Sequence, residues 1–187
     1  MNLHRISSLL FVVTLLMAPH CNAQTSLKGI KDKKAPKLTV DKWVQLPKTK
    51  SATKKKAVDI SDYKGKVVYM FLFQSACPGC RDHGFPTLQK LKKKYKEDKQ
   101  VAFIAIQTVN EGHSVNTPER AKAMAKKFEL NGIAIGHSDS RGAKSIFNAY
   151  KPGGTPWVAV IDKQGVVRHN DYFFDPIQAI KVIDSLK

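Results

Sequence analysis

The apolar positions of the chain fall into runs that predict alternating strands and helices. Residues 67–73 form the densest run, rich in β-branched and aromatic side chains, which is typical of a central strand covered on both faces. Residues 101–107 have the same character and predict a second buried strand. Further strands are predicted at 38–43, 133–136, 157–161 and 166–169, the last two joined as a hairpin around 162–165.

Helical spacing and capping residues predict four helices between these strands. Leu88, Leu91 and Tyr95 recur on one face of a helix over 80–96, where Gly84 and Pro86 predict a kink. Other helices are predicted over 117–130, opened by the Thr117 N-cap and Pro118, over 141–150, and from the Asp175 cap to 186. From the strand at 67–73 onward the order is β-α-β-α-β-α-β-β-α, which predicts an α/β fold with a mixed sheet and helices on both faces.

The first 23 residues have the layout of a secretory signal peptide. Arg5 precedes an apolar run over 9–17, which is too short for an ordinary membrane span, and cleavage is predicted after Ala23. The alternatives are a lipoprotein acylated at Cys21 and an uncleaved anchor. We therefore expect an exported protein with a flexible start at 24–34 and one domain over 35–187.

Removal of the leader leaves Cys77 and Cys80 as the only cysteines, in a CxxC spacing that suits redox or metal chemistry. Pro78 suits a first helical position, which places Cys77 at a helix N-terminus where the dipole favours a thiolate. Cys80 follows one turn later, within reach of a disulfide. Two thiolates supply only half of a tetrahedral zinc shell, and no histidine pair has ligand spacing, so we expect neither metal nor other cofactor.

The formal net charge is +17, mostly from lysines spread over 28–66 and along one helix face at 90–96. An exported protein without a nucleic-acid-binding motif is not expected to bind nucleic acid, and lysines on a helix face are usually solvated. The charge could still attract acidic partners or an anionic membrane surface, which would make any membrane contact peripheral.

Several segments together resemble the thioredoxin-fold disulfide reductases of the bacterial cell envelope, the TlpA/ResA-like group. APKLTV is similar to the opening strand of that group, SDYKGKVVYMFLF to its approach to the active site, CPGC to its redox motif, and GGTPWVAVIDKQGVV to its cis-proline turn and hairpin. The resemblance implies a thioredoxin-like fold with an N-terminal extension, an inserted helix before the third core strand and a location in the periplasm.

Three positions depart from the group. Ala76 stands where tryptophan usually precedes the first cysteine, and Phe71 stands where thioredoxin keeps a buried acidic residue. The helix proline, Pro86, comes one residue later than usual, after His83-Gly84.

The resemblance assigns roles to the CPGC residues. Cys77 is expected to be the nucleophile that attacks a disulfide, and Cys80 to resolve the mixed disulfide. Pro78 and Gly79 are expected to tune the reduction potential through the helix N-terminus.

Substrate contacts are expected from the turn at Thr155 and Pro156. With Pro156 in the cis form, the Thr155 backbone would lie beside Cys77 and pair with a substrate strand. Trp157 is expected either in the core or as a wall of the substrate groove. His83 is a candidate proton relay, and its alternative is an ordinary surface histidine.

The leading hypothesis is a monomeric, exported thiol–disulfide oxidoreductase that reduces protein disulfides and is itself re-reduced by a membrane electron donor. A peroxiredoxin-like peroxidase needs a hydroxyl three residues before its cysteine, where Gln74 stands here, with Ser75 one place later. A Sco-like copper-delivery protein uses CxxxC and a distal histidine, a role that would fall to His137 or His169.

Overall fold

The computed structural model describes residues 28–47, 57–139, 141, 145–172 and 175–187. The expected signal peptide at 1–23, with Cys21, and the lysine-rich segment 49–56 lie outside the described residues. Within those residues, none of the helices is both long and apolar enough to cross a membrane.

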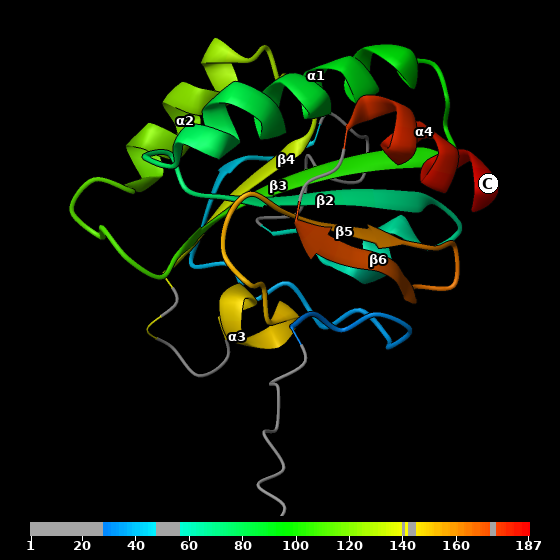
Figure 1. The fold of residues 1–187 in the computed structure, drawn as a ribbon, viewed down its shortest axis with the longest axis horizontal. Helices are drawn as coiled ribbons and strands as arrows, with labels where there is room; N and C mark the ends of the chain where they lie inside the picture. The colour runs from blue at the N-terminus through cyan, green and yellow to red at the C-terminus, as the bar shows by residue number, and fades with distance from the viewer. Residues whose placement is uncertain (1–27, 48–56, 140, 142–144, 173–174) are drawn as a thin grey trace, which may run out of the picture.

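Six strands form one mixed sheet in the order β1-β4-β3-β2-β5-β6 (Figure 1). The strands are β1 (Lys42–Gln45), β2 (Val67–Phe73), β3 (Val101–Val109), β4 (Ala134–Asp139), β5 (Trp157–Ile161) and β6 (Val167–Tyr172). β2, β3 and β4 run parallel, whereas β1, β5 and β6 pair antiparallel with their neighbours. The predicted mixed sheet is therefore confirmed.

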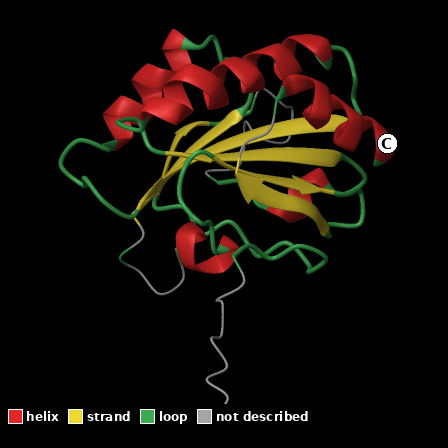
Figure 2. Cartoon of the chain, in the orientation of Figure 1, coloured by secondary structure: helices red, strands yellow, loops and turns green. Residues whose placement is uncertain are grey.

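Helices cover both faces of the sheet, as the cartoon in Figure 2 shows. The α-helices are α1 (Phe85–Lys94), α2 (Pro118–Lys127), α3 (Ile146–Tyr150) and α4 (Pro176–Ser185), with a 3₁₀ turn at Ile60–Tyr63. α1, α2 and α4 lie on one face, and α3 lies on the other together with the segment 28–40. The helix inserted between β3 and β4 is α2, so the expected α/β thioredoxin-like architecture is confirmed.

The central strand β2 is buried on both faces. All seven of its residues are at most 1% exposed. Val67, Tyr69, Phe71 and Phe73 pack under α1, α2 and α4, while the alternate residues pack toward α3 and the N-terminal segment. This double burial fixes the position of the carboxyl end of β2, from which the CPGC turn emerges.

The segment expected to be flexible at 24–34 packs against the domain over its described part, 28–34. Ile30 is buried, and its N–H donates to the Asn170 side chain. Lys34 forms a bridge with Val166 beside the start of β6. Burial of Ile30 and backbone hydrogen bonds of Asp32 and Lys33 with Val167 hold the segment beside β6.

The first strand lies later than predicted. A strand is predicted over 38–43, but the Leu38 N–H donates to Asp59 Oδ1 at 2.9 Å, and the Leu38 side chain packs in the core on the α3 face of the sheet. Pairing with β4 therefore begins only at Lys42. β4 itself runs to Asp139, beyond the predicted end at 136, because β3 continues beside it to Val109.

The helix predicted over 80–96 begins with a π turn, Cys80–Gly84, before α1. The Phe85 N–H donates to the Cys80 carbonyl, a bond that spans one residue more than in an α-helix. Thr117 and Asp175 cap α2 and α4 with their side chains, as predicted. The helix predicted over 141–150 is described as α3, with residues 142–144 outside the described part.

Gly84 in the π turn is packed so tightly that a side chain has no room. A Cβ there would lie 2.7 Å from Cε2 of Phe71 and closer still to Cζ, with Pro156 Cβ at 3.3 Å. The close approach of the turn to the sheet therefore depends on this glycine.

We expect Gly84→Ala to lower the free energy of unfolding by about 1–3 kcal/mol, because overpacking outweighs the roughly 1 kcal/mol by which alanine favours a helix. Urea denaturation measures this change. Phe71→Leu replaces the opposing ring with a smaller side chain. The double variant should therefore lose less free energy of unfolding than the sum of the losses of the two single variants. Additive losses would contradict the packing explanation.

Candidate active site

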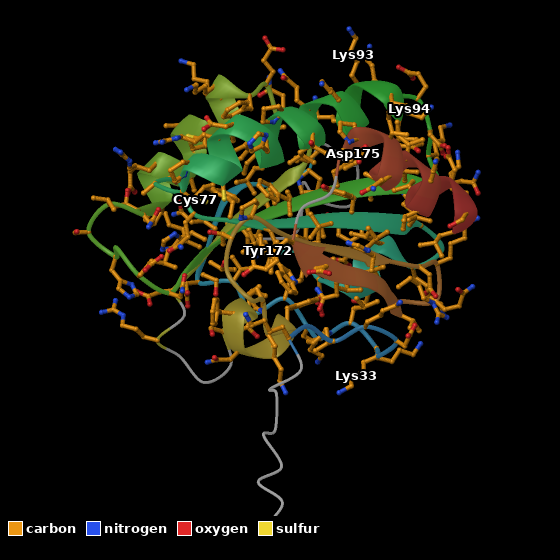
Figure 3. All side chains as sticks on the ribbon, viewed as in Figure 1. Lys33, Cys77, Lys93, Lys94, Tyr172 and Asp175 are labelled. Atoms are coloured by element: carbon orange, nitrogen blue, oxygen red, sulfur yellow. The ribbon has the colours of Figure 1, made fainter. Side chains whose placement is uncertain are left out.

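The nucleophile candidate Cys77 sits where the chain turns from β2 into the helix. Its N–H donates to the Gln74 carbonyl at 3.1 Å, and its own carbonyl accepts the Arg81 N–H at 3.3 Å. The Cys80 N–H donates to Cys77 Sγ at 3.3 Å. Cys77 is partly exposed, and Figure 3 shows it at the start of the helical segment. A partly exposed sulfur at the start of a helical segment is accessible to a disulfide in solution.

Cys80 lies in a different environment. Its side chain is fully buried, next to the aromatic cluster of Phe71, Phe73 and Phe85. Burial, followed by its hydrogen bond with Cys77, raises the pKa of the Cys80 thiol well above its ordinary value. The two thiols are free in this structure, and their unequal environments separate an exposed attacking sulfur from a protected one.

The turn at Thr155 and Pro156 closes over the CPGC segment. Their peptide bond is cis, and Cys77 Sγ lies 3.4 Å from the Thr155 carbonyl oxygen. A Cβ on Gly79 would lie 3.3 Å from Cδ of the buried Pro156, so glycine at that position lets the proline ring approach. Pro78, the residue before Gly79, is exposed.

An open groove of about 550 Å³ lies beside Cys77. It is lined by Gln74, Ala76, Cys77, Pro78, Asn110, Glu111, Gly112, Val115, Asn116, Gly154, Thr155 and Tyr172. Val115 and Tyr172, 44% and 46% exposed, are two of the three exposed large apolar side chains among the described residues. Exposed apolar surface gathered around a nucleophile indicates a binding surface.

Tyr172 forms a wall of this groove, and Trp157 does not. Trp157 is only 2% exposed and therefore lies in the core. Of the two positions expected for it, core or groove wall, the structure shows the core. The ring of Tyr172, which Figure 3 labels, packs edge-on against Trp157 at 5.1 Å, and its hydroxyl donates to the Gly153 carbonyl at 2.8 Å. β6 extends to Tyr172, three residues beyond its predicted end, which is why the sequence did not reveal this wall.

The histidines take separate places. His83 is exposed in the π turn, and its role as a proton relay stays a prediction. His137 lies on β4 against Gln107, while His169 lies on β6. Within the described part of the chain, no group of three or more His, Cys, Asp or Glu side chains is arranged to hold a metal ion.

The sequence analysis missed three buried amides around the CPGC turn. Gln74, Gln107 and Asn116 are nearly or fully buried and hydrogen-bonded to the turn or to one another. Two of them could have been noticed, because Gln74 and Gln107 interrupt apolar runs at the carboxyl ends of β2 and β3. Asn116 carries no such signal.

We expect a neutral alkylating reagent such as iodoacetamide to modify Cys77 and to leave Cys80 unmodified in the reduced, folded protein at neutral pH. Burial keeps Cys80 both inaccessible and protonated, and the thiolate is the reactive form. Peptide mass spectrometry gives the modification of each cysteine. Both should be modified after denaturation, and equal modification in the folded protein would contradict the assignment.

Comparison with known proteins agrees with this geometry. The Redoxin family pattern matches residues 30–183. A thioredoxin-like superfamily protein, SPOA0173, is 31% identical, with 82% of this chain and 95% of that one covered and a TM-score of 0.70.

A thiol-disulfide isomerase from Corynebacterium glutamicum is 28% identical, with 81% and 96% covered and a TM-score of 0.67. A protein from Chlorobium tepidum, assigned as a thiol:disulfide interchange protein DsbE, shares the fold at 24% identity, with 86% and 100% covered and a TM-score of 0.56. No curated protein sequence matches the chain. The chain therefore belongs to the Redoxin family and has the thioredoxin-like fold.

Proposed function

We propose that the protein is a thiol–disulfide oxidoreductase that exchanges disulfides with protein partners through its CPGC dithiol. The observation that carries this proposal is the pairing of two unequal sulfurs. Cys77 faces a groove and accepts the Cys80 N–H at 3.3 Å, whereas Cys80 is fully buried one turn away. Thiol–disulfide exchange needs one accessible nucleophile and one resolving thiol within reach.

The reaction balances with these two groups alone. The Cys77 thiolate attacks one sulfur of a substrate disulfide, forms a mixed disulfide and releases the other substrate sulfur as a thiolate. Cys80 then gives its proton to the released substrate thiolate and attacks Cys77 Sγ, which breaks the mixed disulfide and frees the second substrate sulfur as a thiolate. The substrate gains two electrons, and Cys77 and Cys80 end as a disulfide.

The groove suits an extended polypeptide as substrate. The Thr155 backbone lies beside Cys77, where a substrate strand could form main-chain hydrogen bonds. Val115 and Tyr172 supply apolar contacts on the groove wall. Proteins that contain a disulfide in an accessible, extended segment fit this surface better than a small disulfide does.

We place the activity outside the cytoplasm and in the reducing direction, with a membrane protein as electron donor. The leader-like first 23 residues and the resemblance to envelope disulfide reductases support this placement. The thiol-disulfide isomerase from Corynebacterium glutamicum agrees with a role in disulfide chemistry.

A peroxidase is a weaker alternative. The only hydroxyl beside the expected position belongs to Ser75, which is buried and donates to Gln107 Oε1. That hydroxyl is therefore engaged beneath the turn and does not line the groove with Cys77.

We expect the reduced protein to reduce insulin disulfides and a Cys80→Ser variant to accumulate mixed disulfides with partner proteins, because the second step then lacks its thiol. Non-reducing electrophoresis and mass spectrometry detect the trapped species. A Cys77→Ser variant serves as the control and should trap nothing. Peroxide turnover without any disulfide exchange would reject the proposal, and a reduction potential near that of strong oxidants would reverse its direction.

We expect Tyr172→Ala to raise KM for a protein disulfide several-fold while the rate with a small disulfide changes little, because the loss falls on binding of the polypeptide. Ile177→Ala is a matched control, since Ile177 is 67% exposed on α4 and does not line the groove. Equal effects of the two substitutions would argue against Tyr172 as a substrate contact.

A further inference from the structure

Gln107 lies fully buried at the carboxyl end of β3, beneath the turn that carries Cys77. Its Oε1 accepts the Ser75 N–H at 3.1 Å and also the Ser75 hydroxyl. Its Nε2 donates to the Thr117 carbonyl at 2.9 Å. A backbone N–H can only donate and a backbone carbonyl can only accept, so these two contacts fix which end of the amide is oxygen.

The remaining contact of Gln107 then fixes the state of His137. Nε2 lies 2.9 Å from His137 Nδ1 and brings a hydrogen to it, so Nδ1 must accept. The histidine is therefore neutral, with its proton on Nε2. A protonated ring would direct an N–H at the Gln107 amide hydrogens, and the contact would become repulsive.

A second amide holds the next residue of the same turn. Asn116 Oδ1 accepts the Ala76 N–H at 3.0 Å, and its Nδ2 donates to the carbonyls of Glu111 and Gly112. Ser75 and Ala76 are the two residues before Cys77, and buried side-chain amides satisfy the backbone N–H of each. The position of the Cys77 sulfur is thus set by this polar layer.

We propose that Gln107 is a positioning residue for Cys77 and that it works only while His137 is neutral, so that acid lowers the reactivity of Cys77 through His137. This inference rests on the proposed role of Cys77 as the nucleophile. Protonation of His137 would displace the Gln107 amide, release Ser75 and loosen the turn before the sulfur. Misplacement of a reacting group by a small distance is enough to slow a reaction strongly.

The charges around His137 come from three elements and a neighbouring loop. They are Asp41 and Lys42 at β1, Asp139 on β4 and Glu119 on α2, with His113 and Arg141 paired to Asp139. Burial is the largest influence and lowers the pKa of His137, Lys42 acts in the same direction, and the three carboxylates offset this lowering only in part. The neutral form required by Gln107 is thus also the form that the surroundings favour.

The same shift makes folding sensitive to acid. Because the pKa of His137 is lower in the folded chain than the ordinary value of about 6.5, the folded state binds fewer protons at this site. The contribution of His137 to stability is complete above that ordinary value and decreases as the pH falls toward the folded-state pKa.

The test is the rate at which iodoacetamide modifies Cys77 between about pH 5 and pH 9, a span that brackets the ordinary histidine pKa. Peptide mass spectrometry on the whole chain separates Cys77 from Cys21. We expect one inflection from Cys77 itself and a second at lower pH, below which the reactivity of the remaining thiolate falls about tenfold through loss of the positioning hydrogen bond.

Substitutions identify the group behind the lower inflection. His137→Asn keeps an acceptor oxygen near the Nδ1 position and cannot titrate, so the lower inflection should disappear while the neutral-pH rate is kept. Gln107→Glu replaces the donor with a carboxylate that attracts protonated His137 instead of repelling it, so acid should no longer displace residue 107 and the lower inflection should disappear. His169→Asn is a control and should leave it unchanged, because His169 lies on β6 and is not among the groups that act on His137.

A wild-type profile with a single inflection, or a lower inflection that survives His137→Asn, overturns the proposal. If His137→Asn does not fold, nitrogen NMR of the wild-type imidazole decides between the tautomers. A proton on Nε2 at neutral pH supports the proposal, and a proton on Nδ1 overturns it. Alkylation needs no disulfide substrate. A protein that shows this profile but exchanges with no disulfide would reject the proposed function and leave the positioning role of Gln107 standing.

Discussion

The structure depends on the burial of β2 on both faces. Seven consecutive residues withdrawn from water require cover above and below, which α1, α2 and α4 supply on one side and α3 with the N-terminal segment on the other. Because these layers hold the strand rigidly, its carboxyl end delivers the CPGC turn to a defined place. The reactive sulfur can then sit on a short turn without needing a loop of its own to order it.

The turn lies at the boundary between two unlike environments. On one side aromatic rings enclose Cys80, and on the other side buried amides hold the residues before Cys77. The apolar side keeps one thiol protonated and out of reach, whereas the polar side fixes the backbone that presents the other. The protection of Cys80 and the positioning of Cys77 both depend on where apolar side chains give way to polar ones at the carboxyl ends of β2 and β3.

This division raises a requirement for the second chemical step. Cys80 must lose its proton before it attacks Cys77, yet burial opposes the charged form. Phe71 offers no base from the strand below. The substrate thiolate released in the first step is itself a base close to the site. If it accepts the proton of Cys80, Cys80 becomes the thiolate and the substrate sulfur becomes a neutral thiol. A tightly held substrate would thus favour resolution as well as attack.

The sequence predicted most of this architecture because the relevant forces are local. The run at 67–73, the cap at Thr117 and the CxxC spacing each express burial, capping or helix geometry within a few residues. The N-terminal packing of Ile30, the length of β6 and the amide layer depend on partners distant in the sequence, at separations of 140, 19 and 32 residues. No pattern along the chain shows that Ser75 faces Gln107 or that Tyr172 reaches Gly153.

Two departures from the family pattern prove to be one packing solution. The aromatic ring of Phe71 occupies space beneath the helix start, and only a residue without a side chain fits against it at Gly84. The π turn lengthens one helical turn by a residue at the point where the resemblance leads us to expect Pro86 one position earlier, and Phe85, Leu88 and Leu91 face the sheet after it. Because this adjustment surrounds Cys80 and leaves the hydrogen bonds of the turn before Cys77 intact, it should alter the resolving step more than the first attack.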